Sequence, residues 1–494
     1  MTDFDLAIVG GGINGTGIAR DAAGRGLKVL LVEQGDLASG TSSASTKLIH
    51  GGLRYLEHGW FSLVREALGE REVLWRMAPH LIRPMRFVLP VEPGMRPSWL
   101  LRLGLFVYDH LGGRGLLPGT RSIDLARDPL GAPLRVQYRF AFEYSDCATD
   151  DSRLVVLNAV DAAARGALIR TRTRCLSAER AGEWTLVLET RRRREVATAR
   201  VLINATGPWI GDFARSVLRE AAPEHLRLDK GSHIVVRRLF PHDRGYVLQN
   251  KDRRIVFALP YERDFTLIGT TDNLFSGNPD AVAPEAGEIG YLCAVVNEHF
   301  RAAISPADVV WAFAGVRSLY DDGSTEPQDT MRDYVLALDA PSGSAPMVTV
   351  YGGKITTYRR LAEAVLERLA PHVGKRPTWT KSSHLPGGDF PVNGLATLIA
   401  QVRRSWPFLG DALARRLVAA YGTRVSQILR SAKSGDDLGP RLGADLSGAE
   451  VLYLMEHEWA QTADDVLWRR SKLGLRLAQN ERAALEQFMT GAGR

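Results

Sequence analysis

Residues 4–33, FDLAIVGGGINGTGIARDAAGRGLKVLLVE, decide the fold of this chain. The apolar run 4–9 predicts a buried strand, and glycines follow it at once. Residues 13–25 predict a helix with small residues on one face, and residues 28–33 predict a second buried strand. A strand, a helix and a strand within about 30 residues form a βαβ unit, which requires a parallel sheet.

The glycines of this unit have the spacing of a dinucleotide-binding turn. Gly10 allows the tight turn, Gly12 lets a diphosphate approach the backbone, and Gly15 lets the helix pack close to the sheet. The start of the helix, with Ile13 and Asn14, then stabilises the phosphate charge. Glu33 ends the second strand, where a carboxylate accepts hydrogen bonds from both ribose hydroxyls and disfavours a 2′-phosphate.

A second strand-and-turn element indicates which dinucleotide binds. The strand 201–207 ends in the turn Asn204-Ala205-Thr206-Gly207-Pro208-Trp209, a pattern typical of flavin proteins. We expect Ala205, Thr206, Gly207 and Trp209 to lie near the adenosine and diphosphate. Together with the additional glycine at position 11, this pattern favours FAD over NAD.

Composition and charge restrict the remaining possibilities. The chain has 494 residues, of which 45% are hydrophobic and 24% charged, so it can bury a large core and is not mainly disordered. No apolar stretch is long enough for a transmembrane helix, the N-terminus lacks a basic signal-peptide region, and three widely spaced cysteines favour a reducing cytosol. The net charge of +7 suits nucleic acid, anionic lipid or an anionic small substrate. The arginines at 191–194 lie between two alternating runs and predict an exposed hairpin tip.

Several further motifs occur in one order along nearly the whole chain. They are Ser42-Ser43-Ala44-Ser45-Thr46-Lys47-Leu48-Ile49-His50-Gly51-Gly52-Leu53-Arg54-Tyr55-Leu56, Lys230-Gly231-Ser232-His233-Ile234-Val235-Val236, Ile268-Gly269-Thr270-Thr271-Asp272, Ala314-Gly315-Val316-Arg317, Gly352-Gly353-Lys354-Ile355-Thr356-Thr357-Tyr358-Arg359 and His457-Glu458-Trp459. This series closely resembles the bacterial FAD-dependent (aerobic, respiratory) glycerol-3-phosphate dehydrogenases. Ser318 departs from the family pattern, where proline is expected after Gly-Val-Arg, so we expect the loop that holds Arg317 to be slightly looser and its guanidinium to be kept.

The resemblance implies an α/β fold with a Rossmann-like FAD-binding domain of the D-amino-acid-oxidase type, a β-rich substrate domain and a C-terminal all-helical domain. We assign 1–82, 141–225 and 331–370 to the FAD-binding domain, 83–140 and 226–330 to the substrate domain, 371–394 to a linker and 395–494 to the helical domain. The implied reaction oxidises sn-glycerol 3-phosphate to dihydroxyacetone phosphate by hydride transfer to FAD, and the electrons pass to a membrane quinone, ubiquinone or menaquinone.

The resemblance also implies roles for individual residues. Residues expected to contact FAD, beyond those of the glycine turn, Glu33 and the 205–209 turn, are Thr41, Ser42, Ser43, Ser45, Lys47, Leu48, His50, Gly51, Gly52, Gly353, Lys354 and Thr356. Residues expected to bind the substrate are Arg54, Tyr55, Thr270, Arg332 and Lys354, because a dianionic phosphate needs several fixed cations and hydrogen-bond donors. His233 is the expected base, and Arg317 is the rival catalytic group through stabilisation of an alkoxide. The histidines lack metal-ligand spacing, so we expect no metal.

The last expectations concern partners. Residues 95–110 combine Arg96 and Arg102 with Trp99, Leu100, Leu103, Phe106 and Val107, which suits either an interfacial helix or a helix packed on the protein's own core. We expect a cytoplasmic homodimer, peripherally bound to the anionic inner face of the cell membrane, with no nucleic acid. Two alternatives stay open: an FAD oxidase of the same fold that acts on amino acids or sarcosine, and a flavin-containing RNA-binding protein.

Overall fold

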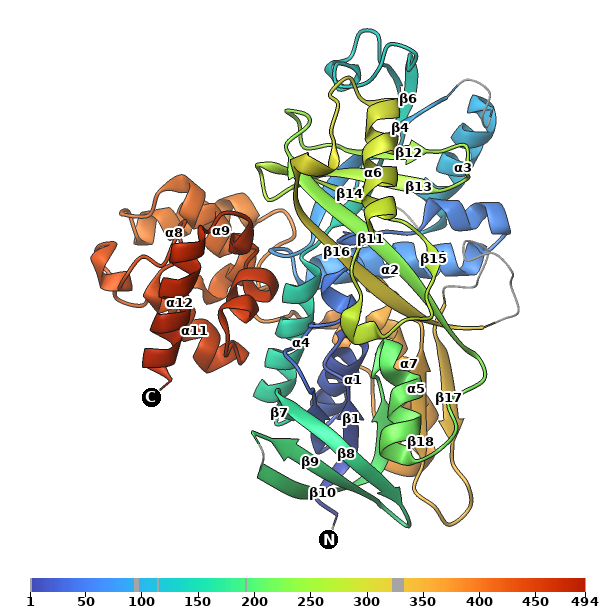
Figure 1. The fold of residues 1–494 in the computed structure, drawn as a ribbon, viewed down its shortest axis with the longest axis vertical. Helices are drawn as coiled ribbons and strands as arrows, with labels where there is room; N and C mark the ends of the chain where they lie inside the picture. Colours follow the sequence, from blue (N-terminus) through green and yellow to red (C-terminus); the bar gives the residue numbers. More distant parts are fainter. Residues whose placement is uncertain (1, 93–96, 113–114, 192, 322–332, 494) are drawn as a thin grey trace.

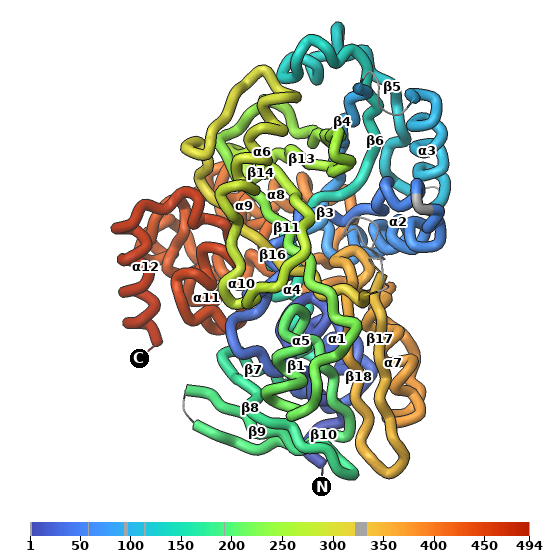
Figure 2. Tube along the Cα trace, turned by 45° about the vertical axis from the view of Figure 1, so that its right-hand side comes forward, coloured from blue at the N-terminus to red at the C-terminus, as the bar shows by residue number. Residues whose placement is uncertain are grey.

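The protein contains two mixed β-sheets with helices on their faces, beside a separate helical part (Figure 1). The computed structural model describes residues 2–92, 97–112, 115–191, 193–321 and 333–493. The helical part, coloured orange to red, lies against one flank of the two-sheet body in both views (Figure 2).

The first sheet holds the predicted βαβ unit. Its strands are β1 (Phe4–Val9), β2 (Val29–Val32), β7 (Leu168–Arg170), β8 (Thr173–Arg180), β9 (Trp184–Thr190), β10 (Arg193–Asn204), β17 (Val335–Asp339) and β18 (Met347–Tyr351). The spatial order is β17-β18-β10-β1-β2-β7, with parallel pairing from β18 to β7. Strands β9 and β10 form the predicted hairpin, because Thr190 pairs with Arg193, while Arg192 lies outside the described residues.

Both faces of this sheet are covered, as its continuous apolar strands require. Helices α1 (Ile13–Gly24), α4 (Asp151–Ala164) and α7 (Tyr358–Val373) pack on one face, where Leu6 and Ile8 of β1 enter their core. The alternate residues Ala7 and Val9 enter the opposite core, beneath β8 and β9 and beside α5 (Ile210–Phe213). The carboxyl ends of β1, β2 and β10 therefore meet at one edge, which carries the glycine turn, Glu33 and the 205–209 turn.

The second sheet is the expected β-rich unit. Its strands are β3 (Leu48–Ile49), β4 (Arg83–Pro90), β5 (Arg121–Asp124), β6 (Phe140–Ala148), β11 (Leu226–Arg237), β12 (Gly245–Gln249), β13 (Ile255–Tyr261), β14 (Phe265–Gly269), β15 (Asn273–Leu274) and β16 (Val309–Tyr320). Helix α6 (Ala286–His299) packs on one face, and α2 (Phe61–Met77) and α3 (Ser98–Leu111) pack on the other. Strand β6 pairs within this sheet, although the FAD-binding segment predicted from the sequence begins at residue 141.

The C-terminal part is helical where the structure describes it, between residues 395 and 493. Its helices are α8 (Leu395–Ser405), α9 (Asp411–Tyr421), α10 (Val425–Leu429), α11 (Gly448–Glu458), the π-helix η11 (Asp465–Arg470) and α12 (Gln479–Ala492). They enclose a core of their own, and α11 and η11 contact α4. Across the described residues, none of the helices combines the length and the apolar character that a membrane span needs.

Candidate flavin and substrate site

Backbone packing explains the glycines of the first turn. Gly10 has a positive φ of 117°, and a Cβ there would lie 2.3 Å from the carbonyl oxygen of Ala205. A Cβ on Gly15 would lie 1.9 Å from the carbonyl oxygen of Gly10, so α1 approaches the turn as closely as a backbone can. Gly12 immediately precedes α1, and a Cβ there would lie 3.0 Å from Ser42 Oγ. The turn is therefore built from the three positions that the spacing predicts.

Glu33 is fixed at the end of β2. Its two carboxylate oxygens accept hydrogen bonds from the Gly11 and Gly35 amides, each at 2.7 Å. Burial raises the pKa of this carboxyl, and the two amides oppose the rise. A carboxylate has about four acceptor positions, so acceptor capacity remains for ribose hydroxyls.

A buried polar atom beside this turn also fits a bound cofactor. Asn14 Nδ2 donates to the Gly352 carbonyl at 3.1 Å, whereas the buried Asn14 Oδ1 has no hydrogen-bond partner within the described residues. A buried acceptor without a partner is costly unless a ligand supplies a donor. Asn14, Glu33 and the start of α1 thus form a cradle whose chemistry fits the diphosphate and ribose of FAD.

The serine-rich segment that follows β2 is held by buried contacts. Ser42 Oγ accepts a hydrogen bond from the Ile13 amide at 3.0 Å. Asp151, the first residue of α4, accepts from Ser45 Oγ at 2.7 Å and from Lys47 Nζ at 2.9 Å. Lys47 Nζ also donates to the Ser43 carbonyl, and burial lowers the pKa of Lys47. Since an ammonium group has three donors and these bonds use them, the geometry supports a loop-holding role for Lys47. Its direct contact with FAD stays a prediction.

The segment from Leu48 to Gly52 lies between the two sheets. Leu48 pairs with Ala148 in β3–β6, and the His50 amide donates to Thr356 Oγ1 at 3.3 Å. The Gly51 amide donates to Tyr108 OH at 2.8 Å. Gly52 has a φ of 77°, and a Cβ there would lie 2.2 Å from the Tyr55 ring. These contacts place the predicted flavin residues of this segment beside those of the loop 352–356.

The 205–209 turn closes the other side of the cradle. The Ala205 amide donates to the Val9 carbonyl at 2.9 Å, and Thr206 Oγ1 donates to Asn204 Oδ1 at 2.6 Å. Gly207 has a φ of 60°. The Trp209 ring packs over Gly40, so this turn reaches the segment that contains Thr41 and Ser42.

His233 occupies a buried position on β11. Its side chain is 1% exposed, stacks on Phe313 with ring centroids 5.0 Å apart, and lies against Gly269 of β14. Its Nε2 is 3.0 Å from Thr46 Oγ1, while the buried Nδ1 has no hydrogen-bond partner in the described part of the chain. Burial, with the nearby charges of Lys47 and Arg317, lowers the pKa of His233 well below its usual value. The imidazole is therefore neutral at pH 7 and available to accept a proton.

Arg317 and Thr270 converge over the middle of β11. Arg317 lies within strand β16, and not in a loop as expected, opposite Asp229 of β11. Its Nη1 donates to Asp272 Oδ1 at 2.9 Å. A Cβ on Gly231 would lie 2.6 Å from Thr270 Oγ1 and 2.9 Å from Arg317 Nη2. Gly231 thus leaves space for both groups, two residues along β11 from His233.

Lys354 supplies a second cation, and its ammonium nitrogen is buried. Its Nζ lies 3.7 Å from the centroid of the Tyr55 ring, and this buried nitrogen has no hydrogen-bond partner where the structure describes the chain. The Gly352 amide donates to the Ser318 carbonyl, which brings the loop of Lys354 beside the strand of Arg317. Arg54 lies in the same short helix as Tyr55, η2 (Leu53–His58). Arg332 lies outside the described residues.

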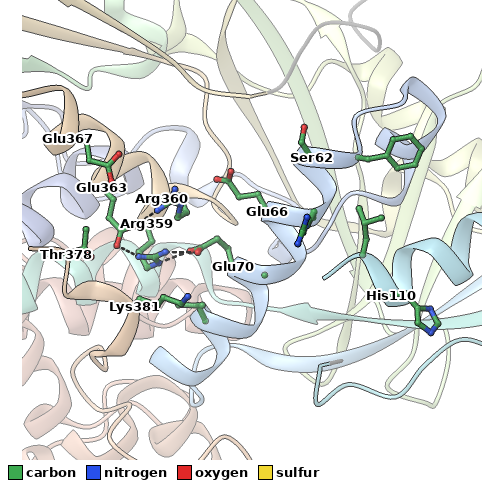
Figure 3. A pocket seen from close by; sticks show the side chains of 15 residues that line it. Ser62, Glu66, Glu70, His110, Arg359, Arg360, Glu363, Glu367, Thr378 and Lys381 are labelled. Carbon is green, nitrogen blue, oxygen red and sulfur yellow. Dashed lines mark hydrogen bonds and ion pairs between the residues drawn. The ribbon is translucent and has the colours of Figure 1, made fainter. Parts of the chain in front are cut away.

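A large surface pocket lies elsewhere, between α2 and α7 (Figure 3). Its volume is about 1090 Å³, and its lining contains none of the residues that the sequence predicts for the site. Its central Arg359 is already paired with Glu70 at 2.6 Å and with Glu363. We place the active site between the sheets instead, because the buried acceptor of Asn14 and the buried ammonium of Lys354 lie there.

Three residues that hold this site were not assigned from the sequence. Thr46 touches His233, Asp151 holds the serine-rich loop, and Asp272 pairs with Arg317. Thr46 and Asp272 lie inside the motifs, but the motifs do not say which side chains meet. Asp150 and Asp151 follow a strand and begin a helix, which is the usual signal of an N-terminal cap rather than of a site.

The cradle beside a parallel sheet, the adjoining substrate sheet and the buried histidine and cations define a flavin-dependent oxidoreductase. Comparison with known families agrees. Residues 5–359 match the family described as FAD dependent oxidoreductase, and residues 378–493 match the C-terminal domain of alpha-glycerophosphate oxidase. The chain therefore belongs to the FAD-dependent oxidoreductases and, within them, to the glycerol-3-phosphate dehydrogenase family.

Individual relatives cover nearly the whole chain. The glycerol-3-phosphate dehydrogenase of Pseudomonas aeruginosa is 51% identical over 98% of this chain and 95% of its own length. The D-erythritol 1-phosphate dehydrogenase of Brucella abortus is 49% identical over 99% of this chain and 98% of its own. The crystal structure of the glycerol-3-phosphate dehydrogenase from Bacillus halodurans complexed with FAD is 26% identical, with a TM-score of 0.78 over 99% of this chain and 90% of that one. The expected fold class and FAD cofactor are thereby confirmed.

The boundary between the two matched families falls at 360–377 and overlaps the start of the expected linker 371–394. Helix α7 ends at Val373, three residues inside that linker. The finer domain boundaries stay predictions.

Proposed function

We propose that this protein oxidises the C2 hydroxyl of sn-glycerol 3-phosphate to the ketone of dihydroxyacetone phosphate. The observation that carries the proposal is the buried Lys354 ammonium, which has no hydrogen-bond partner among the described residues. A buried cation without such a partner is costly, and a phosphate group of the substrate removes that cost.

We assign the phosphate to Lys354, Arg54 and Arg332, and the reacting carbon to the space beside Thr270 and Arg317. Several fixed cations bind a dianion much better than one does. Arg317 is oriented by its hydrogen bond to Asp272, which directs its other donors toward Gly231 and Thr270. A guanidinium held in this way stabilises negative charge that develops on the substrate oxygen.

We assign the removal of the hydroxyl proton to His233. Its neutral state and its buried Nδ1, which finds no hydrogen-bond partner in the described part of the chain, support this role. If Nε2 donates to Thr46, Nδ1 is the free acceptor. FAD, when bound, supplies the hydride acceptor, and we assign His50 to its vicinity because the His50 backbone joins Thr356.

We further propose that a membrane quinone, ubiquinone or menaquinone, takes the electrons and that α3 meets the anionic inner face of the membrane. Helix α3 packs Leu105 and Tyr108 into the core but leaves Trp99, Leu103 and Phe106 67%, 52% and 59% exposed. An exposed apolar row with Arg102 beside it suits the lipid interface. Arg96 lies outside the described residues. The homodimer stays a prediction that light scattering tests.

Anaerobic mixing with candidate substrates tests the reaction. Glycerol 3-phosphate should bleach the flavin absorbance rapidly, whereas amino acids should leave it unchanged. D-Erythritol 1-phosphate belongs in the same series, because a relative that is 49% identical carries that name. Faster bleaching by D-erythritol 1-phosphate would replace the substrate that we propose, and bleaching by an amino acid alone would overturn the reaction class.

A further inference from the structure

Three basic residues of the C-terminal part, Arg469, Arg470 and Lys472, contact segments that border the cofactor cradle. Arg469 and Arg470 end the π-helix η11, and Lys472 follows two residues later. Arg470 and Lys472 are almost completely buried. Buried charges of this kind are retained only with fixed partners.

The first contact reaches the loop that follows Glu33. Arg470 binds both carboxylate oxygens of Asp36, with Nη2 2.8 Å from Oδ1, and Arg469 also pairs with Asp36. Two residues later, the Ala38 amide donates to the Gly11 carbonyl at 3.1 Å. Asp36 therefore joins the C-terminal part to the loop that lies between the ribose-binding carboxylate and the glycine turn.

The second contact reaches the start of α4. Lys472 Nζ is 3.1 Å from Asp150 Oδ1 and donates to Ser152 Oγ at 2.7 Å. Asp150 caps α4 by accepting from the Arg153 amide at 3.1 Å. The next residue, Asp151, holds Ser45 and Lys47 of the serine-rich loop. A displacement of Asp150 is thus transmitted through one peptide bond to the loop that faces the cofactor.

We propose that Arg470 and Lys472 are positioning residues for FAD, so that the C-terminal helical part completes the cofactor cradle. The two contacts fix the loops on both sides of the α1 N-terminus, and both residues act through the side chains that they hold, Asp36 and Asp150. The inference rests on the use of FAD and requires nothing about the substrate. It gives the C-terminal part a role in cofactor affinity.

Titration of the flavin-free protein with FAD tests this inference, with quenching of flavin fluorescence as the readout. Lys472→Met should raise the FAD dissociation constant by about tenfold, the factor that corresponds to the lower range for a lost charge-assisted hydrogen bond. The control is Arg416→Met, because Arg416 is also largely buried in the C-terminal part but pairs with Glu450 at 2.7 Å, away from the cradle. Wild-type affinity in Lys472→Met, or an equal loss in Arg416→Met, would overturn the proposal.

A second variant covers the case in which Lys472→Met does not fold. Asp150→Asn combined with Lys472→Met removes both charges and leaves no unpaired carboxylate at position 150. This double variant should also bind FAD more weakly than the wild type, and wild-type affinity would contradict the inference. Because the titration contains no substrate, its outcome is independent of whether glycerol 3-phosphate is the substrate.

Discussion

At the scale of single residues, the site depends on how burial sets the charge of His233. Desolvation disfavours the imidazolium, and the charges of Lys47 and Arg317 disfavour it further, so the pKa of His233 falls well below its usual value. The imidazole accordingly stays in its base form from neutral pH down to well below pH 6.5. If protonation of His233 limits the reaction of the free enzyme, the rate of flavin reduction should therefore fall only when the pH drops below 6.5.

His233→Asn should lower the rate of flavin reduction by about 10²–10⁴-fold, the range for a general base. The acidic limb of the rate-versus-pH profile should disappear with it. Anaerobic stopped-flow reduction across pH measures both effects. Arg317→Ala is the matched comparison: it should slow the reaction comparably and keep the acidic limb, because guanidinium does not titrate in this range. If the limb survives in His233→Asn, the base is another residue or water.

Lys354→Met should reduce kcat/KM for glycerol 3-phosphate by about 10- to 150-fold, because it removes one charge-assisted contact worth about 1.5–3 kcal/mol. Residual oxidation of unphosphorylated glycerol should hardly change, and Arg332→Ala should behave in the same way. Lys381→Met is the control, since Lys381 is exposed at the rim of the pocket between α2 and α7. Steady-state kinetics with both substrates check this. Equal losses on both would assign Lys354 to the flavin or to the fold.

At the scale of elements, helix α3 shows two faces with different surroundings. Leu105 and Tyr108 join the core of the second sheet, so part of the helix packs on the protein itself. Trp99, Leu103 and Phe106 lie on the exposed side. One face of the helix thus packs on the protein's own core, as the second alternative for residues 95–110 predicts, and the interfacial role of the exposed face stays a prediction.

Leu103→Glu should weaken binding to vesicles that contain anionic lipid by at least about tenfold, because burial of one leucine contributes about 1.5–3 kcal/mol. Co-sedimentation with such vesicles measures the partition. Val196→Glu is the control, because Val196 is 65% exposed on β10, in the hairpin of the first sheet. Unchanged partition of Leu103→Glu, or an equal decrease in both variants, would remove α3 as the membrane contact.

At the scale of the whole molecule, acid stability depends on histidines that are buried in the neutral form. His80 is fully buried where α2 ends, its ring lies 6.3 Å from that of Phe390, and burial lowers its pKa to about 3. The unfolded chain binds a proton on this residue near pH 6.5, whereas the folded chain does not. Folding is therefore progressively destabilised as the pH falls below 6.5 toward 3, by about 1.4 kcal/mol per pH unit.

His80→Gln should flatten this part of the stability profile, whatever its effect at pH 7.5. Urea unfolding at pH 7.5, 6 and 5, followed by tryptophan fluorescence, gives the difference between the two proteins. The free energy of unfolding of the wild type should decrease more than that of the variant as the pH falls. A constant difference between the two would show that His80 takes up its proton in the folded state.

The sequence by itself determined the parts whose signals are local. The βαβ unit, the glycine turn with Glu33, the 191–194 hairpin and the helical character after residue 395 each follow from neighbouring residues, because periodicity and turn chemistry act over a few positions. The ordered motifs were enough to predict the family and the FAD cofactor, while the contact residues assigned to the loops stay predictions.

Only the tertiary structure decided which of these residues meet. Thr46 reaches His233 across 187 positions, Asp151 lies 104 positions from Lys47, and Arg470 contacts Asp36 across 434. The fold also decides that Lys47 donates its hydrogen bonds to protein groups, Ser43 and Asp151. The buried ammonium of Lys354 instead lies over the Tyr55 ring. The desolvation of a side chain and the charges around it depend on all the atoms that the fold brings near it, so no local sequence pattern encodes them.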